Sequence, residues 1–403
     1  MLKRSLMGGI VSAGVHVADL SQAPLPIDRF HTQHVGATGG VHVRVSPFDV
    51  RVCDIKFFDQ HALDMGKPSE RKVENVFFRE DFRRVTYDDV GRIFESPRVG
   101  EAYSQAFVKN VAHAKELAAA HSKIVVNFSH GTAAGFLPQL LDTLGIDSVP
   151  IRGVVSENVG ARSMDDFEQQ KRELGTITST LRATCGVIID AGGEKIFVAD
   201  DRGRVIDDRH FLAVYAGLAA SEGKDVIAVP GFAPAVVERL VTEAGGRLTR
   251  VRSSAEAQMS YAAREKPLLV ADGLGGFIFP AFHPWFDGLF AVVRLLELLA
   301  LGGRSLSQLV DETPVPHIAR LKVECPWNAK GRVMRLLAQE PATERTRQVD
   351  GVKHVNGGEW VLVLPDVDQP VFNVWAEAAD DGRAWALAHQ YADRVNALRG
   401  DNE

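Results

Sequence analysis

The stretch from Gly39 to Asp59 reads GGVHVRVSPFDVRVCDIKFFD, and it is the most informative part of this 403-residue chain. Its first half is rich in β-branched residues and predicts a strand that runs into a turn holding Ser46. Residues 55–58, IKFF, predict the strand that leaves the turn. A serine on such a turn has two interpretations: it caps the exposed turn, or it carries a phosphoryl group.

Length and charge limit the classes of protein to which the chain can belong. At ~100 to 200 residues per domain, 403 residues with 45% apolar content predict two to four domains. The net charge is −6, and acidic and basic residues are interspersed. Because no basic stripe is available to neutralise a phosphate backbone, we expect no nucleic-acid partner.

Two features of the sequence indicate the cellular compartment of the protein. No apolar run reaches the ~20 residues that span a bilayer, and the N-terminal MLKRSLMGGIVSAG lacks a long apolar core and a small-residue cleavage site. These features predict a cytoplasmic protein with no membrane partner. Cys53, Cys185 and Cys325 form no CxxC pair and lie in separate apolar stretches, so they predict buried thiols rather than disulfides or a zinc site.

Short apolar β runs alternate with amphipathic helices along most of the chain, which predicts layered α/β domains with parallel or mixed sheets. Within this pattern, residues 101–121 predict one long helix, and residues 244–251, AGGRLTRV, predict a turn. Residues 313–316, TPVP, predict a linker. After it the sequence becomes β-rich and ends in a helix at 383–398, which indicates a smaller α+β domain.

The serine stretch resembles the active-serine loop of the phosphohexomutases, the family of phosphomannomutases and phosphoglucomutases. In that family a double glycine, a β run, Thr-Ala-Ser-His-Asn-Pro, a short turn and Gly-Ile-Lys-Phe follow at the same spacing. The residues that keep this register are Gly39, Gly40, Ser46, Ile55, Lys56 and Phe57. Pro47, Phe48 and Asp49 stand where the family has His, Asn and Pro. The resemblance implies that Ser46 is the catalytic phosphoserine and that Arg44 helps to neutralise its phosphate.

The resemblance also implies the architecture: an α/β protein with three similar mixed α/β-sheet domains plus a smaller α+β C-terminal domain around a central cleft. The expected boundaries are 1–98, 99–207, 208–314 and 315–403. The family's first strand and helix have no counterpart before Met1. We therefore expect an N-terminally truncated first domain, and an unpaired sheet edge there would favour a homo-oligomer or another associating chain.

The family's metal loop is Asp-Gly-Asp-Ala-Asp-Arg, three alternate carboxylates that hold magnesium against the phosphoserine. The equivalent residues run from Asp190 to Lys195 and read DAGGEK, so that Gly192 replaces the middle carboxylate. The resemblance implies that Asp190 and Glu194 are ligands of a weaker Mg²⁺ site, since one oxygen ligand is lost. It also makes Lys195 a substrate-binding residue. Without the resemblance, the same residues predict an ordinary hairpin.

Two further family loops have altered equivalents. The sugar loop, Gly-Glu-x-Ser-Gly, corresponds to a stretch in which Asp272 and Gly275 are the candidate substrate-binding residues and Leu274 replaces the serine. The alternative is a glycine turn before a buried strand. The phosphate clamp, Arg-Pro-Ser-Gly-Thr-Glu-Pro, corresponds to residues 364–370, LPDVDQP. The arginine is lost and Asp366 and Asp368 are added, so this loop should not bind a phosphosugar in the family's way. Another arginine, such as Arg252, is the candidate replacement.

A subgroup of the family resembles the chain more closely: the mutase-like C-terminal region of bacterial mannose-1-phosphate guanylyltransferases. The stretches that carry this likeness are HVR at 42–44, PSERKVENVFFREDFRRV at 68–85, FIFPAF at 277–282 and WVLVLPD at 360–366. No nucleotidyltransferase glycine-rich loop is present in the sequence. The chain therefore resembles a module for hexose phosphates or sugar nucleotides, with a nucleotidyltransferase as a partner or fused domain.

Two functions from different classes follow. The first, which the altered clamp favours, is a pseudoenzyme-like module with weak or lost mutase activity that binds a sugar phosphate or regulates a guanylyltransferase. The second is an active isomerase that interconverts hexose 1- and 6-phosphates through phosphorylated Ser46, with magnesium at Asp190 and Glu194. Among the other side chains that attract notice, His283, Trp360 and Trp375 are predicted to pack in the core.

Overall fold

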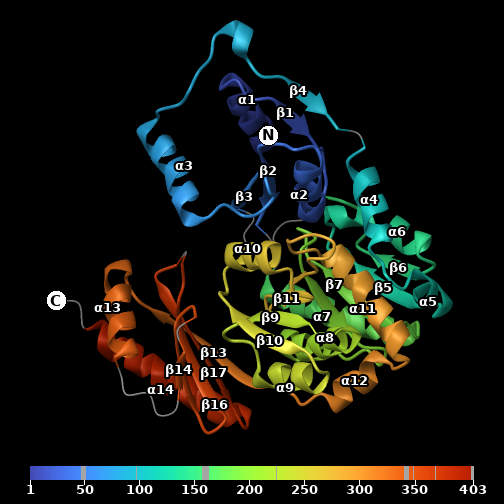
Figure 1. The fold of residues 1–403 in the computed structure, drawn as a ribbon, viewed down its shortest axis with the longest axis vertical. Coiled ribbons are helices and arrows are strands. Elements are labelled where there is room, and N and C mark those ends of the chain that lie inside the picture. Colours follow the sequence, from blue (N-terminus) through green and yellow to red (C-terminus); the bar gives the residue numbers. More distant parts are fainter. Residues whose placement is uncertain are drawn as a thin grey trace. The chain divides into compact units, whose positions relative to one another are not determined.

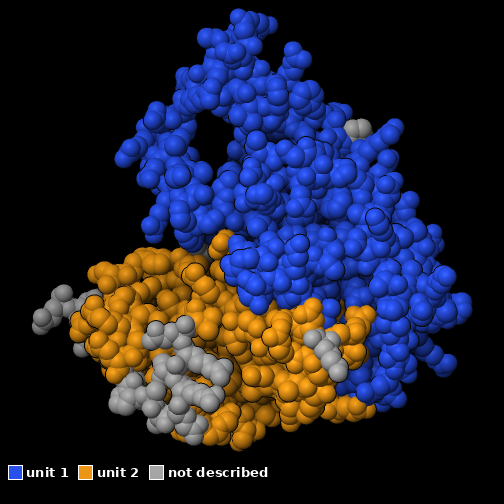
Figure 2. Space-filling model, viewed as in Figure 1, with its two compact units in different colours: residues 1–206, 259–270, 275–309 blue, residues 207–258, 271–274, 310–403 orange. Residues whose placement is uncertain are grey.

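The computed structural model describes residues 1–46, 51–96, 98–156, 163–223, 225–339, 345–347, 349–367 and 369–400. Figure 1 shows the ribbon with most of its elements labelled. The chain divides into two compact units, coloured in Figure 2. Unit 1 comprises residues 1–206, 259–270 and 275–309, and unit 2 comprises residues 207–258, 271–274 and 310–403. Pro47, Phe48, Asp49 and Asp368, which the sequence analysis singled out, lie outside the described residues.

The described N-terminal part of unit 1 contains short strands, three α-helices and one 3-10 helix. The elements are α1 (Leu2–Ser12), β1 (Val17–Asp19), α2 (Leu25–His34), β2 (Gly39–Val45), β3 (Cys53–Asp59), α3 (Lys67–Arg79), η1 (Tyr87–Asp89) and β4 (Ile93–Glu95). Strand β1 pairs in parallel with β4, and β2 pairs antiparallel with β3 from Gly39↔Asp59 to Val45↔Cys53. Gly40 lies against the ring of Phe58, where a Cβ atom would come within 2.0 Å of Cε2. The predicted pair of strands around Ser46 is therefore present.

The next part of unit 1 is a four-stranded sheet in the order β6-β5-β7-β8. Its elements are α4 (Val99–Lys109), α5 (Ala114–Ala119), β5 (Lys123–Asn127), η2 (Thr132–Gly135), α6 (Leu137–Thr143), β6 (Asp147–Ile151), α7 (Met164–Thr180), β7 (Cys185–Ile189) and β8 (Ile196–Ala199). Strand β5 is parallel to β6 and β7, and β8 is antiparallel to β7. All five residues of β7 are buried, as expected for a strand covered on both faces.

The prediction of one long helix over residues 101–121 is wrong. The side chain of Asn110 turns back to donate to the carbonyl of Ala106 at 2.8 Å, and α4 ends there. A new helix, α5, begins after His113, whose backbone N–H donates to the carboxylate of Glu297. Glu297 belongs to α11 (Gly288–Gly302), which is buried along nearly its whole length. A contact across 184 residues therefore breaks the helix.

The third set of elements alternates helices and strands in the same way. It comprises α8 (Asp208–Glu222), β9 (Val226–Pro230), α9 (Ala235–Glu243), β10 (Arg247–Val251), α10 (Ala255–Glu265), β11 (Leu269–Ala271), β12 (Phe277–Ile278), α11 and α12 (Leu306–Glu312). The predicted turn over residues 244–251 is correct only for residues 244–246, which follow α9. The rest is strand β10, which pairs in parallel with β9. The glycines therefore end the turn, and pairing with β9 holds the residues after them as a strand.

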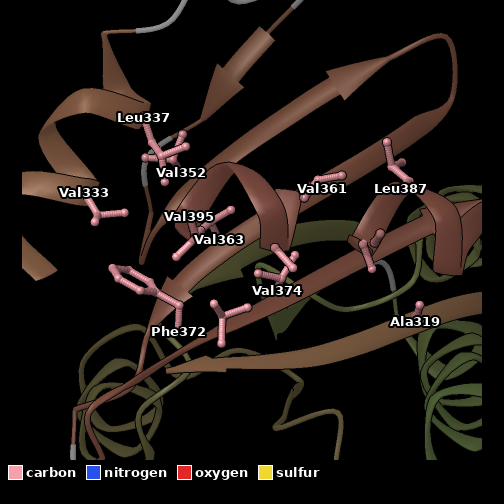
Figure 3. Close-up of a cluster of buried hydrophobic side chains, with 14 of the residues drawn as sticks. Ala319, Val333, Leu337, Val352, Val361, Val363, Phe372, Val374, Leu387 and Val395 are labelled. Carbon is pink, nitrogen blue, oxygen red and sulfur yellow. The ribbon is translucent and has the colours of Figure 1, made fainter. Parts of the chain in front are cut away.

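The C-terminal domain is an antiparallel sheet in the order β13-β17-β16-β15-β14 with two helices. Its elements are β13 (His317–Glu324), α13 (Trp327–Ala338), β14 (Arg345–Arg347), β15 (Val352–Asn356), β16 (Glu359–Pro365), β17 (Val371–Ala378) and α14 (Asp381–Arg399). Strand residues such as Val361 and Val363 pack with helix residues such as Val333 and Val395 to form its core (Figure 3). Trp360 and Trp375 form a second buried cluster with Phe232, so their predicted packing role is confirmed.

The prediction of three buried thiols is correct for Cys185 and Cys325 and wrong for Cys53, which is exposed. Cys53 is the first residue of β3. Side chains alternate between the two faces of the β2–β3 ribbon, and Cys53 lies on the face that is open to solvent. None of the helices in the described part of the chain is long and apolar enough to cross a membrane.

Glu377 of β17 provides a test of pH dependence. It is buried, and it accepts a hydrogen bond from the backbone N–H of Ala235 at 2.9 Å and another from the indole of Trp360. Burial raises the pKa of Glu377 above 4.5, although these hydrogen bonds oppose the shift. An acid with a raised pKa binds more protons in the folded state, so its contribution to stability falls as pH rises through the raised value.

We expect Glu377→Gln, which does not titrate, to gain stability relative to the wild type as pH rises from about 4 to about 7, measured by urea unfolding at each pH. Glu359→Gln is the matched control, because a hydrogen bond from Arg383 lowers the pKa of Glu359. This control should lose stability relative to the wild type over the same range. Parallel pH profiles for the two variants would contradict the assignment.

Candidate functional site

Ser46 immediately follows β2, and its half-buried side chain lies where the hairpin closes. The backbone N–H of Ser46 donates to the carbonyl of Val52 at 2.8 Å. Side chains two residues apart on a strand lie on the same face, which places Ser46 beside Arg44. The predicted serine therefore directly follows a strand, two residues after Arg44.

The turn from Asp190 to Lys195, which joins β7 and β8, is closed by Asp190 itself. Its Oδ1 atom accepts from the backbone N–H groups of Glu194 at 2.7 Å and Lys195 at 2.8 Å, and its Oδ2 atom accepts from that of Gly192 at 3.2 Å. The turn is also held from outside by α2 and α11, since the carbonyls of Gly192 and Gly193 accept from Leu25 and Gly288. Asp190 is thus a structural acceptor at the centre of a fixed turn.

Arg44 links the serine strand to this turn. Its Nε donates to Asp54, directly opposite on β3, at 3.2 Å, and its Nη1 lies 3.7 Å from Oδ2 of Asp190. Burial alone would lower the pKa of Arg44, but the negative charges of Asp190, Glu194 and Asp54 raise it overall. The guanidinium therefore remains charged and bridges two carboxylates.

Glu194 is buried and pairs with two cations. Its Oε2 lies 2.7 Å from Nζ of Lys56, and its Oε1 lies 4.0 Å from Nη2 of Arg29. Burial alone would raise the pKa of Glu194, but the positive charges of Lys56, Arg29 and Arg44 lower it to about 2. Arg29 of α2 is fully buried, forms an ion pair with Asp64 and donates to the carbonyl of Ala62 at 2.6 Å.

The structure therefore brings Arg44, Asp190 and Glu194 together and adds two cations that the sequence analysis did not assign to the site. Lys56 had a signal in the sequence, because it lies in the family register that was quoted for the serine loop. Arg29 had none, since nothing in its helical context distinguishes it from a surface arginine. Its position becomes evident only when α2 packs against the loop between β3 and α3.

The residues of this turn do not fit a magnesium ion. Mg²⁺ requires near-octahedral oxygen ligands at about 2.0–2.1 Å. Oδ1 of Asp190 already accepts two backbone hydrogen bonds, and Glu194 is bonded to Lys56. Within the described ranges, no group of three or more His, Cys, Asp or Glu residues is arranged to hold a metal ion.

Asp272 and Gly275, the sugar-loop candidates, are both constrained by local structure. In unit 2, Oδ1 of buried Asp272 accepts from the backbone N–H of Leu274 at 2.7 Å, and Gly273 has φ +72°. In unit 1, the carbonyl of Gly275 accepts from Ile196 at 2.9 Å, and its φ is +91°. A Cβ atom on Gly275 would lie 2.7 Å from the carbonyl oxygen of Ile196, so the contact requires glycine.

The loop equivalent to the phosphate clamp is a turn between β16 and β17 that Asp366 closes. Its Oδ1 accepts from the backbone N–H of Gln369 at 3.0 Å, and its Oδ2 accepts from the amide of Asn373 at 3.1 Å. Lys330 donates to the carbonyl of Asp366. Arg252, the proposed replacement for the lost arginine, is largely exposed, and its Nε lies 3.5 Å from Asp350.

Three family models match the chain. Phosphoglucomutase/phosphomannomutase alpha/beta/alpha domain I matches residues 1–84, domain II matches residues 101–203, and domain III matches residues 210–316. The fold of three α/β domains followed by a β-rich C-terminal domain agrees with this assignment and confirms the predicted fold class. The chain belongs to the α-D-phosphohexomutase superfamily.

Curated relatives are similar over nearly the whole chain. A phosphoglucomutase/phosphomannomutase of Thermococcus kodakarensis is 25% identical over 386 residues, covering 95% of this chain and 84% of the relative. A phosphopentomutase of the same organism is 24% identical, covering 98% and 88%. A probable phosphoglucosamine mutase of Pyrococcus abyssi is 25% identical, covering 96% and 85%. The chain is thus similar to mutases that are named for different sugars.

Solved structures share the fold. A phosphoglucomutase/phosphomannomutase family protein from Burkholderia thailandensis has a TM-score of 0.83 at 17% identity, covering all of this chain and 87% of the other. A putative phosphomannomutase from Thermus thermophilus has a TM-score of 0.73 at 19% identity, covering 96% and 85%. An N-acetylphosphoglucosamine mutase from Aspergillus fumigatus, solved in complex with GlcNAc-6P and magnesium, has a TM-score of 0.59 at 13% identity, covering 98% and 94%.

Proposed function

We propose that this chain is a phosphohexomutase-fold module that binds a hexose phosphate or sugar nucleotide and has weak or no mutase turnover. The observation that carries the proposal is the turn at residues 364–370. Leu364 stands where the resemblance places the clamp arginine, and Asp366, two residues later, closes the turn with its carboxylate. By the resemblance, a substrate phosphate would need positive charge at this turn, and the negative charge of Asp366 supports the proposal that such a phosphate binds weakly.

The expected repulsion between a carboxylate of this turn and a substrate phosphate is large. A carboxylate facing a phosphate at ~4 Å repels it by about 1 kcal/mol per charge pair in water and by about 4 kcal/mol at an effective dielectric constant of 20. Together with the lost arginine, the penalty amounts to several kcal/mol, which corresponds to ~1,000-fold in affinity. An enzyme that must hold the non-reacting phosphate during turnover would be slowed by at least that factor.

The alternative is an active phosphomannomutase or phosphoglucomutase that uses a phosphoserine at Ser46. One feature favours it: Arg44 lies two residues before Ser46, so strand periodicity puts both on one face, where the guanidinium can neutralise part of a phosphate charge. In this alternative the substrate-binding roles of Lys195, Arg252, Asp272 and Gly275 follow the family pattern. Magnesium at Asp190 and Glu194 would be needed as well, and the turn does not fit it.

One experiment separates the two functions. Purified protein with magnesium and a hexose 1,6-bisphosphate activator is incubated with mannose or glucose 1-phosphate, and the 6-phosphate is followed by ³¹P NMR. We expect turnover at least ~1,000-fold below that of the Thermococcus kodakarensis phosphoglucomutase/phosphomannomutase assayed in parallel. Rapid turnover that Ser46→Ala stops would overturn the proposal.

Binding is tested separately by calorimetry with mannose 6-phosphate and with mannose. The phosphate ester should bind in the millimolar range, and Asp366→Asn should strengthen its binding about fivefold because one repulsive charge is removed. Glu359→Gln, which removes a partly exposed carboxylate paired with Arg383 in the same domain, is the matched control and should leave the affinity unchanged. Equal effects of the two variants, or no heat with the phosphate ester, would count against the proposed site.

The resemblance to the C-terminal region of mannose-1-phosphate guanylyltransferases extends this proposal to a partner. We propose that the module acts with such a nucleotidyltransferase, as a separate or fused chain, and regulates it. A partner that binds the folded state should raise the melting temperature of the purified chain in a concentration-dependent way. An unchanged melting temperature at micromolar partner would exclude a stable complex.

A further inference from the structure

The turn from Asp190 to Lys195 is surrounded by the chain's own cations. Arg44 approaches Asp190, while Lys56 and Arg29 approach Glu194. These three cations come from β2, β3 and α2, so three separate elements bring positive charge to one turn. Their side chains are 19%, 29% and 0% exposed, respectively, which means that solvent screens them weakly.

Gly192 shows where the guanidinium of Arg44 lies with respect to the turn. A Cβ atom built on Gly192 would be 2.3 Å from Nη1 of Arg44 and 3.1 Å from Oδ2 of Asp190. The backbone at Gly192 is outside the left-handed region, so its conformation would accept a side chain. The guanidinium of Arg44 occupies the space that a side chain on Gly192 would enter, so Arg44 would have to move aside for one.

Gly192 also stands where the metal loop of the phosphohexomutases, by the resemblance, carries its middle carboxylate. The turn therefore lacks one negative charge of the family pattern and has the positive charge of Arg44 at the same place. Where the family pattern has the middle carboxylate, this chain has Gly192, and the guanidinium of Arg44 lies at that point. The charges of the two remaining carboxylates, Asp190 and Glu194, are balanced by arginine and lysine side chains.

We infer that Arg44, supported by Lys56 and Arg29, is a built-in counter-ion that takes the place of a divalent metal at the Asp190–Lys195 turn. The turn is neutralised by side chains that fold with it, so its structure is independent of magnesium. Ser46 then lies beside a fixed guanidinium and not beside a metal ion. The inference concerns this turn alone and does not depend on which sugar the chain binds.

The test measures metal binding directly, in the full chain without sugar. Mn²⁺ binding is followed by electron paramagnetic resonance, and the melting temperature is recorded with MgCl₂ and with EDTA. The wild type should show no Mn²⁺ site at the turn up to millimolar concentration, and its melting temperature should be the same in both solutions. Millimolar or tighter Mn²⁺ binding that Asp190→Asn removes would overturn the inference.

The decisive variant is Arg44→Ala/Gly192→Asp, which removes the guanidinium and adds the third carboxylate. It should bind Mn²⁺ about 100-fold more tightly than the wild type and gain a magnesium-dependent rise in melting temperature. Arg44→Ala alone should bind Mn²⁺ more weakly than the double variant. Arg4→Ala/Gly8→Asp makes the same change of charge on exposed α1, where a Cβ on Gly8 meets no atom within 4 Å, and should gain no site.

Each outcome decides the question. Folding of the variants is verified by a cooperative melting transition, and Arg44→Ala serves where the double variant does not fold. A folded variant without Arg44 that gains no affinity for Mn²⁺ would show that the guanidinium does not take the metal's place. A gain that the α1 control reproduces would show a general effect of net charge, which also contradicts the inference.

Discussion

Replacing Asp287 by alanine is expected to lower the free energy of unfolding by about 4 kcal/mol. Asp287 is 1% exposed and precedes α11. Its Oδ2 accepts from the hydroxyl of Tyr103 at 2.7 Å and from Nε2 of His283 at 2.8 Å, while its Oδ1 accepts from the backbone N–H of Phe290 at 2.9 Å. One carboxylate therefore connects α4, the loop before α11 and the first turn of α11.

The expected loss combines two effects. Removing a helix cap costs about 1 kcal/mol, and each buried polar group left without a partner costs about 1–3 kcal/mol. Tyr103 and His283 are both buried, so neither can replace the lost hydrogen bond with one to solvent. Burial, and then the charge of Asp287, raise the pKa of Tyr103 well above 10, so the hydroxyl remains a neutral donor.

The measurement is urea unfolding of wild type and variants. Asp380→Ala is the matched control, because Asp380 caps α14 from an exposed position by accepting from the backbone N–H of Arg383 at 2.8 Å. It should cost only about 1 kcal/mol. Asp287→Asn, which retains an acceptor, should fall between the two. Equal losses for Asp287→Ala and Asp380→Ala would show that the buried hydrogen bonds do not contribute.

Lys56→Ala is expected to cost about 3 kcal/mol, because it removes the closest positive charge from buried Glu194. The loss is smaller than for a fully isolated buried charge, since Arg29 remains 4.0 Å away. Urea unfolding again provides the measurement. The matched control is Lys67→Ala, whose partner Glu70 is exposed and whose ion pair should contribute less than about 0.5 kcal/mol.

The double variant Lys56→Ala/Glu194→Gln separates charge from packing. Because glutamine carries no charge to be left unpaired, the double variant should be more stable than Lys56→Ala alone. Such non-additivity is the expected signature of a direct pair. If the two substitutions simply added, the stabilisation by Lys56 would come from its aliphatic stem and not from its charge.

The repeated α/β fold was predictable from the sequence because it depends on local patterns. Strands such as β5 and β7 are short apolar runs, and helices such as α7 and α14 are periodic and capped, so their signals do not need distant residues. The helix break at residues 110–113 was not predictable. It depends on the carboxylate of Glu297, which no local pattern connects to His113.

The site divides in the same way. The resemblance to the phosphohexomutases pointed to the loops of Ser46, Asp190 and Asp366, because the family's spacing along the chain is kept even where the side chains differ. The partner of each charge was decided only by the tertiary structure. Arg29 and Lys56 lie far from Glu194 in sequence, and they meet it because α2 and the β2–β3 ribbon pack onto the turn between β7 and β8. Electrostatic energy depends on the distance between charges and on their burial, and the order of the residues gives neither quantity.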